Sequence, residues 1–489
     1  MQGVLIALLG SRSFSAGSRR ITRTGPRLHA IALAISFGAA LVAPKAAHAL
    51  GLADVYEAAL GHDPVFAAAA KQKEADDANV AIGRSYLLPN VSANYSTYRN
   101  VTGTTYFGQP PGDVSVHQVY GAYSEGVSLR QSLINFEGIA RYRYGKATAL
   151  AGDATFDDRK QELLVRVLGA YTDTVFAQEQ LLLATAQKKA FDEQFAGNVA
   201  MFKNGEGTRT DILETKSKAE LAQADVADAR DNVDNAAHTL EALTGLPASL
   251  DIAGLDRLKD DYQPTLPSPL GFDEWRDIAL ENNAQLIAER HSVEAAGQQV
   301  KIVRAGFYPR VDLVASIGKS QSNTLDTIGQ RYLTKAVGVE ITIPLYSGGL
   351  VQASSQQAQA NYERAQFDLQ DKTDKVLLDL RKQYNICVSS LTRIDALRSA
   401  VESATLQITA TQKSVQAGMR TNLDVLTATQ QLYQAKRDLA RTRYQYLLAE
   451  LQLKRAAGIL SPQDLYGIAQ WFVPSAQLAN AANPMPLIH

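Results

Sequence analysis

The sequence contains one cysteine, almost no net charge and, beyond its first 49 residues, no long apolar run. A single cysteine, Cys387, cannot form a disulfide within the chain, so an exported form must gain its stability from packing or from oligomerisation. The 49 Lys and Arg residues balance 50 Asp and Glu residues, which disfavours nucleic acid as a partner. The apolar runs after residue 49 are shorter than the roughly 20 residues that a membrane-spanning helix requires.

The sequence also lacks the residue patterns of common catalytic sites. No His-Glu-x-x-His motif and no pair of cysteines occurs, and Gly205-x-Gly207 lacks the lysine and the strand-to-helix context of a phosphate-binding loop. The histidines are scattered along the chain, for example His62, His117, His238 and His291. We therefore expect no enzymatic activity, no cofactor and no metal site.

What the chain does contain is an internal duplication. FKNGEGTRTDILETKS at residues 202–217 recurs as VQAGMRTNLDVLTATQ at residues 415–430, an offset of 213 (415 − 202). Similarity at a fixed offset over this length is the signature of a repeat architecture. The two copies are predicted at residues 50–246 and 271–458.

The first 49 residues are predicted to be a signal peptide. Arginines at positions 19, 20, 23 and 27 precede an uncharged stretch from Leu28 to Ala43, and Ala47-His48-Ala49 supplies a small-x-small cleavage site. The uncharged stretch is too short to span a membrane. We therefore expect an exported protein whose mature chain begins at Leu50.

Each copy is predicted to contain a hairpin of long helices. The residues after each glycine turn form heptads: Ile212, Ala219, Val226, Val233 and Leu240 in the first copy, and Val425, Leu432, Leu439, Tyr446 and Leu453 in the second. Such seams are typical of closely paired helices. The predicted helices are 137–203 and 209–244 around a tip at 204–208, and 350–416 and 422–457 around a tip at 417–421.

A long helix of this kind would reach on the order of 100 Å, which has no use in a globular domain. Gly145, Gly152, Gly169 and Gly197 within the first one leave its continuity open.

A β-hairpin is predicted ahead of each long helix, after a preceding helix. Val337, Val339 and Ile341 alternate with small or polar residues, and the partner strand runs from Val311 to Ile317. The hairpins are expected at about 86–133 and 307–346. The first copy has less regular strands near Val91–Tyr98 and Val119–Leu129, joined by a loop at Val101–His117; the second loop is expected at Lys319–Arg331.

Several tyrosines of the first hairpin would suit an aromatic girdle at a membrane interface: Tyr95, Tyr98, Tyr106, Tyr120 and Tyr123. Four strands per chain cannot close a membrane barrel, because about eight are needed, so several chains would have to share one. A soluble hairpin packed on the helices is the alternative that the residues alone leave open.

The order of these elements, with LLPNVS, FYPRVD and IPLYSGG at their junctions, resembles the TolC family of outer membrane channel proteins. The most specific stretch is AGMRTNLDVLTATQQLYQAKRDLARTRYQYLLAELQLKRAAG at residues 417–458. The resemblance implies a mixed α and β membrane protein: a homotrimer whose three sets of four strands form one twelve-stranded β-barrel, continuous with a long α-helical coiled-coil barrel. The linker 247–270 and the C-terminal segment 459–489 would form an equatorial belt around the helices.

The resemblance also implies a place in the Gram-negative outer membrane, with lipid around the strands and helices in the periplasm. The implied partners are a periplasmic adaptor protein and an inner membrane efflux pump or ABC transporter. The implied function is a passive exit duct for drugs and other small molecules or for secreted proteins. A dedicated type I protein or toxin secretion channel is the alternative, and a trimeric coiled-coil adhesin or periplasmic scaffold is a remote one.

The resemblance assigns a periplasmic gate, or pore constriction, to Asp424, Arg420 and Asp211, with the Asp424 carboxylates forming an acidic ring. It assigns contacts with the adaptor to residues at the hairpin tips: Gly205, Gly207, Thr208, Gly418, Met419 and Thr421.

Simpler interpretations compete with this gate. Thr208-x-x-Asp211 and Thr421-x-x-Asp424 are also typical helix capping patterns, and Arg420 could be a solvated charge. Thr427 stands where relatives carry a second acidic residue and Val415 where they carry a tyrosine, so the closed state is expected to have fewer polar links.

Overall fold

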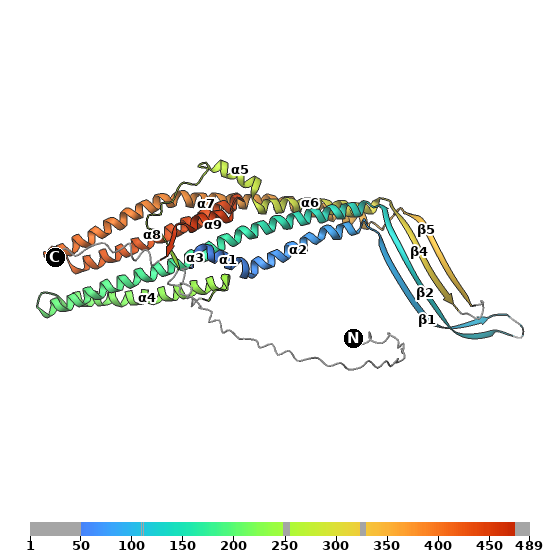
Figure 1. Cartoon of the computed structure of the whole chain (residues 1–489), viewed down its shortest axis with the longest axis horizontal. Coiled ribbons are helices and arrows are strands. Elements are labelled where there is room, and N and C mark those ends of the chain that lie inside the picture. Colours follow the sequence, from blue (N-terminus) through green and yellow to red (C-terminus); the bar gives the residue numbers. More distant parts are fainter. Residues whose placement is uncertain (1–49, 109, 111, 248–254, 323–328, 475–489) are drawn as a thin grey trace, which may run out of the picture. The chain divides into compact units, whose positions relative to one another are not determined.

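The computed structural model describes residues 50–108, 110, 112–247, 255–322 and 329–474. The predicted signal peptide, part of the linker 247–270 and the end of the C-terminal segment lie outside these residues. The first half contains α1 (Leu52–His62), α2 (Pro64–Ser85), β1 (Asn90–Tyr106), β2 (Val114–Ile134), α3 (Phe136–Lys203) and α4 (Arg209–Thr244) (Figure 1). None of the described helices has both the length and the apolarity needed to cross a membrane.

The second half has the same order of elements. It contains α5 (Phe272–Asn282), α6 (Ala284–Arg304), the short 3-10 helix η2 (Ala305–Phe307), β4 (Arg310–Ser322), β5 (Gln330–Thr342), α7 (Leu350–Gln416) and α8 (Asn422–Ala457). A two-stranded sheet of β3 (Asp256–Leu258) and β6 (Phe472–Pro474) and the helix α9 (Pro462–Ala469) complete the described chain.

The four long strands form one antiparallel sheet in the order β1-β2-β4-β5, in which β2 and β4 join the two halves. The strands of the first hairpin are longer than predicted. Pairing continues from Val101 opposite Val119 to Tyr106 opposite Val114, through most of the segment that we expected to be a loop. The prediction was wrong because the threonines and valines of this segment favour extended backbone despite the glycines beside them.

The register gives the sheet one apolar and one polar face. One row across the apolar face is Val91, Leu129, Ala315 and Val337, and the next row on the polar face is Ser92, Ser128, Ser316 and Ala336. The register divides the tyrosines of the predicted aromatic girdle between the two faces. Tyr95 and Tyr123 lie on the apolar face, whereas the register puts the other three tyrosines on the polar face.

The helix expected before each hairpin is in fact two helices. The first break falls at Asp63, whose carboxylate accepts a hydrogen bond from the Phe66 N–H (2.9 Å) and caps α2, while Pro64 supplies a first residue that needs no N–H partner. Asn283 caps α6 in the same way, through the N–H of Leu286 (3.0 Å). Each break lets the short first helix turn away from the second.

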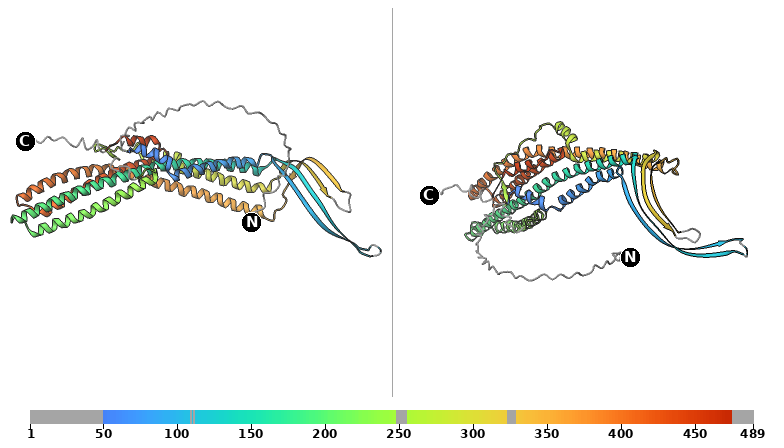
Figure 2. Two further views of the ribbon diagram at one scale, coloured as in Figure 1. Left: turned by 60° about the horizontal axis from the view of Figure 1, so that its bottom comes forward. Right: turned by 45° about the vertical axis from the view of Figure 1, so that its right-hand side comes forward.

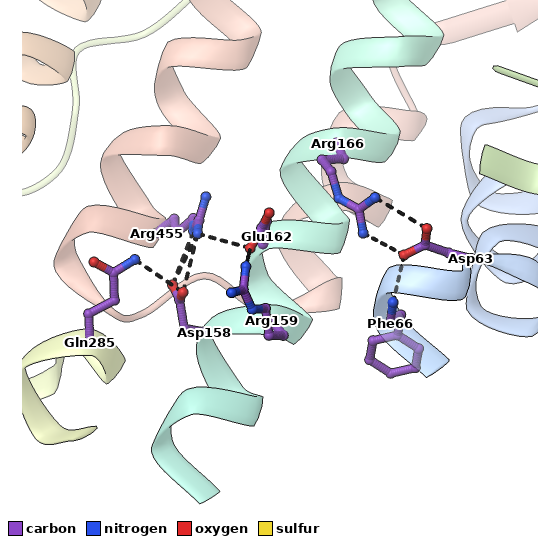
Figure 3. A network of polar contacts seen from close by, with 8 residues as sticks. All are labelled: Asp63, Phe66, Asp158, Arg159, Glu162, Arg166, Gln285 and Arg455. Carbon is purple, nitrogen blue, oxygen red and sulfur yellow. Dashed lines mark hydrogen bonds and ion pairs between the residues drawn. The ribbon is translucent and has the colours of Figure 1, made fainter. Parts of the chain in front are cut away.

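Ion pairs attach these shorter helices to α3 (Figure 3). The Arg166 guanidinium donates to both oxygens of the buried Asp63 carboxylate, at 3.2 and 2.5 Å. Burial alone would raise the pKa of Asp63, but the hydrogen bonds from Arg166 and from backbone N–H groups, together with the charge of Arg166, outweigh burial and the pKa is lowered. Asp158 of α3 accepts hydrogen bonds from Gln285 of α6 and Arg455 of α8, both at 3.1 Å. The middle of α3 therefore holds elements of both halves together.

The main hydrophobic core lies at the same level of the molecule. Leu163, Leu168 and Tyr171 of α3 are fully buried there with Leu380 of α7 and Leu447 of α8. The Tyr171 hydroxyl donates to the backbone oxygens of Leu50 and Asp256, which satisfies its hydrogen-bonding need in an apolar site. Away from this level the helices meet mainly along the predicted heptads, where Val226 and Leu432 are buried.

Despite its glycines, α3 is one continuous helix of 68 residues, and it carries two shorter helices along its length, α2 and α4 (Figure 1). The glycines have a packing role. A Cβ atom at Gly145 would lie 2.2 Å from the backbone oxygen of Asn79 in α2, so the two backbones approach more closely than any side chain permits.

We expect Gly145→Ala to destabilise the protein by about 1–3 kcal/mol, because the added methyl must push α2 away from α3. Gly197→Ala is the matched control, since it lies on the same helix with no atom within 4 Å of an added Cβ. That change should be stabilising by about 0.5–1 kcal/mol through helix propensity. Thermal unfolding of the purified proteins measures both; equal melting temperatures for the two variants would contradict the packing role.

Candidate functional site

The candidate site comprises the two tips at which long helices reverse direction. Gly205 (φ 81°) and Gly418 (φ 69°) are left-handed, a conformation that glycine adopts without strain. Thr208 and Thr421 are the N-caps of α4 and α8. The two views of Figure 2 and the contacts between α4 and α8 place the hairpins side by side.

Both predicted caps are present. The Asp211 carboxylate accepts hydrogen bonds from the N–H (3.1 Å) and hydroxyl (2.6 Å) of Thr208, and the Asp424 carboxylate accepts the same pair from Thr421, each at 3.0 Å. The capping interpretation is therefore confirmed for both aspartates. The backbone and side-chain hydrogen bonds from Thr421, together with the nearby charge of Arg420, lower the pKa of Asp424.

Arg420 itself is exposed, next to the cap of α8. Within the described part of one chain, no ion pair joins it to Asp211. The hydroxyl of Thr427 donates to the backbone oxygen of Leu423 (2.9 Å), so it is engaged within its own helix, and Val415 is half-buried.

A polar contact that the sequence analysis missed joins the two hairpins. Thr215 of α4 is fully buried, and its hydroxyl accepts hydrogen bonds from the side-chain amides of Asn198 in α3 (2.6 Å) and Asn422 in α8 (3.1 Å). The same hydroxyl donates to the Asp211 backbone oxygen (2.7 Å), so its one donor and two acceptor positions are all used. The available signal was a threonine at a seam position that is otherwise apolar.

A second polar contact between the hairpins lies further along the helices, where the Lys218 ammonium donates to the Gln430 side-chain oxygen (3.0 Å).

The tips also expose large apolar side chains that one chain leaves uncovered: Met201, Phe202, Leu213, Met419 and Leu423, each at least 44% exposed. Apolar side chains gathered at an exposed tip are typical of a contact surface.

The four-stranded sheet and the two hairpins of long helices define a TolC-like channel fold. The solved outer-membrane channel OprN superimposes with a TM-score of 0.72 at 18% identity, covering 83% of this chain and 89% of OprN. The four-stranded sheet is part of that fold.

The family of outer membrane efflux proteins matches residues 55–246 and 275–459, and this chain belongs to it. Over 441 residues the chain is 43% identical to the alkaline protease secretion protein AprF of Pseudomonas aeruginosa, covering 89% of this chain and 90% of AprF. Over 427 residues it is 36% identical to the proteases secretion protein PrtF of Dickeya chrysanthemi, covering 87% and 92%. The predicted resemblance is thereby confirmed: the protein is an exit channel of the Gram-negative outer membrane that extends into the periplasm.

We expect Thr215→Val to loosen the tips, because it leaves the amides of Asn198 and Asn422 without their buried acceptor, at about 1–3 kcal/mol. Hydrogen exchange should become faster at the starts of α4 and α8 while the core around Leu168 keeps its protection. Thr215→Ser keeps the hydroxyl and serves as the control. Unchanged exchange at the tips of the valine variant would show that the contact does not hold the hairpins together.

Proposed function

We propose that this channel is the outer membrane component of a type I secretion system whose cargo is a protease. The observation that carries the proposal is the identity of 43% with AprF over nearly the whole chain, a protein named for the secretion of alkaline protease. PrtF, also named for protease secretion, supports the same choice. Among the functions that the sequence left open, this favours a dedicated protein duct over multidrug efflux.

The working unit is a homotrimer. One chain presents β1 and β5 as the two edges of its sheet, and every residue of β5 is exposed. Unpaired strand edges cannot remain in lipid, where no water satisfies the backbone. Three copies supply twelve strands (3 × 4), enough to close a barrel with a lumen, whereas one copy supplies four.

The tips form the closed gate of this trimer. Three-fold symmetry brings three Asp424 carboxylates around one axis, and the hydrogen bonds from Thr421 favour the ionised form of each. Such a ring favours cations over anions. The Asp211 carboxylate caps α4 and still has free lone pairs. These lone pairs accept hydrogen bonds from Arg420 of a neighbouring copy, and this link holds the entrance narrow.

Opening moves α7 and α8 of each copy outward. The contact of Asn422 with Thr215 must then break as well, so it adds to the stability of the closed state. A periplasmic adaptor grips the tips through the glycine turns around Gly205, Gly207 and Gly418 and the exposed apolar side chains beside them, including Met419. An inner membrane ABC transporter supplies the energy, and the duct itself is passive.

Deletion of the gene tests the cargo. We expect the extracellular protease to disappear from the culture medium, because no other exit passes the outer membrane for it, while susceptibility to detergents and hydrophobic drugs stays unchanged. The measurement is protease activity in the medium beside minimal inhibitory concentrations, in the deletion strain and after complementation. Drug hypersensitivity with normal secretion would instead identify an efflux duct.

The gate is tested by Arg420→Ala in planar bilayers. Removing the link between copies destabilises the closed state and so lowers the free-energy cost of opening, and single-channel conductance should rise severalfold. Arg209→Ala removes an exposed cation from the other tip, at the start of α4, and should leave conductance near the wild-type value. If both variants conduct like the wild type, Arg420 is only a solvated charge.

A further inference from the structure

The outer face of the sheet changes character along its length. We define the outer face as the side chains in register with Val91, Leu129, Ala315 and Val337. Toward the helices this face is apolar, with Val311, Leu313, Val339 and Ile341. Because the apolar side of a membrane sheet faces lipid, this is the surface that contacts the bilayer.

The outer face from Ile341 to Arg331 has the length of a bilayer core. From Ile341 to Arg331, β5 advances ten residues (341 − 331), about 33 Å at roughly 3.3 Å per residue. At a strand tilt near 40° this is about 25 Å along the membrane normal, the usual height of the lipid-facing band. The helices lie in the periplasm, so the end of the band near Arg331 lies at the outer leaflet.

Cationic side chains gather in the half of this span nearer Arg331 and in the row just beyond it. In four successive rows of the outer face, the register places Lys335 beside Ile317, Lys319 beside Glu125, Arg331 beside Gln321, and Arg99 beside Gly121. Glu125 is the only acidic side chain in these described rows, and its nearest contact with the Lys319 ammonium is 3.6 Å. The outer face therefore carries an excess of positive charge where it leaves the apolar band.

The opposite face is uncharged at the same level. Its rows there hold Asn94, Ser96, Ser124, Ser320 and Thr334 with glycines and tyrosines. If these cations served only solubility, the lumen-facing side of the sheet, which contacts water, would be equally suitable for them. The cations are placed instead on the side that faces lipid, although a cation near hydrocarbon is unfavourable unless an anion or water receives it.

Aromatic side chains accompany the cations. The Lys319 ammonium lies 6.0 Å from the centre of the Tyr123 ring, and Tyr95 occupies the same row as Lys319, 70% exposed. Tyrosines at this depth anchor a barrel at the membrane interface. Cations of this kind can bind the phosphates of a lipid headgroup, and the tyrosine rings beside them can pack against its first sugars.

We propose that this cationic belt, Arg99, Lys319, Arg331 and Lys335, binds the phosphate groups of the phosphorylated glycolipid of the outer leaflet. The glycolipid is the anionic component on that side of the membrane, and its phosphates lie at the hydrocarbon boundary. Arg331 and Arg99 lie at this boundary, and Lys319 and Lys335 extend their long side chains toward it. Repetition of the belt in each copy surrounds the channel with bound glycolipid. The inference depends on the outer membrane location and not on the identity of the cargo.

The test uses the full-length protein, purified in detergent, and titrated in native mass spectrometry with three lipids. These are a glycolipid with two phosphates, the same glycolipid after enzymatic removal of its phosphates, and phosphatidylglycerol. Wild-type protein should prefer the phosphorylated glycolipid. Lys335→Gln combined with Arg331→Gln should weaken its binding about 25-fold, since each cation near an anionic surface contributes about fivefold, and should leave binding of the dephosphorylated lipid unchanged.

The control variant combines Lys189→Gln with Lys375→Gln, two exposed cations on the periplasmic helices α3 and α7. It should bind all three lipids like the wild type. The proposal is overturned if the belt variant binds the phosphorylated glycolipid as tightly as the control, or if phosphatidylglycerol binds to the wild type equally well. Secretion of cargo by the belt variant is a separate readout, so failure here leaves the proposed cargo untouched.

Discussion

The close contact between α2 and α3 is the constraint on which the rest of the structure depends. A helix of 68 residues cannot fold around one compact core, so it needs a lateral partner at almost every turn. Gly145 lets the backbone of α2 supply this partner over the half of α3 nearest the sheet, and α4 supplies it over the other half. Because β1 begins within five residues of the end of α2 at Ser85, the same contact also sets where the sheet starts.

The strength of packing differs between the middle of the molecule and the tips, and this difference suits a gate. The core around Leu168 and Tyr171 is extensive and fully buried. Near the tips the described clusters are small, such as Phe191 with Ala219, Ala222 and Leu426, and hydrogen bonds of Thr215 and Asn422 make up much of the remaining contact. Elements with few buried apolar contacts open at the lowest free energy. The tips can therefore separate while the middle stays intact.

How much the sequence could predict depended on whether a feature is local. The heptads put Val226 and Leu432 at the right faces, and the capping patterns of the tips could be read because each involves four consecutive residues. The break at Asp63 was overlooked although the Asp-Pro pair signals it, because the helical pattern resumes at once. Thr215 stands out only as a threonine in an otherwise apolar seam. Its partner Asn422 could not be assigned, since it lies 207 residues away in the sequence. A contact between copies, such as the proposed gate link, is harder still to predict from a single sequence.

The duplication explains how two similar hairpins can have different roles. At the offset of 213, Asn422 corresponds to Arg209 (422 − 213), and Thr215 corresponds to Ala428 (215 + 213). The residues that join the hairpins therefore have no counterpart in the other copy, whereas the caps at Asp211 and Asp424 are shared. Helix formation needs the caps in both copies, so both retain them. The gate proposed for the tips needs one hairpin that moves against another that stays, and unequal residues at equivalent positions would provide this difference.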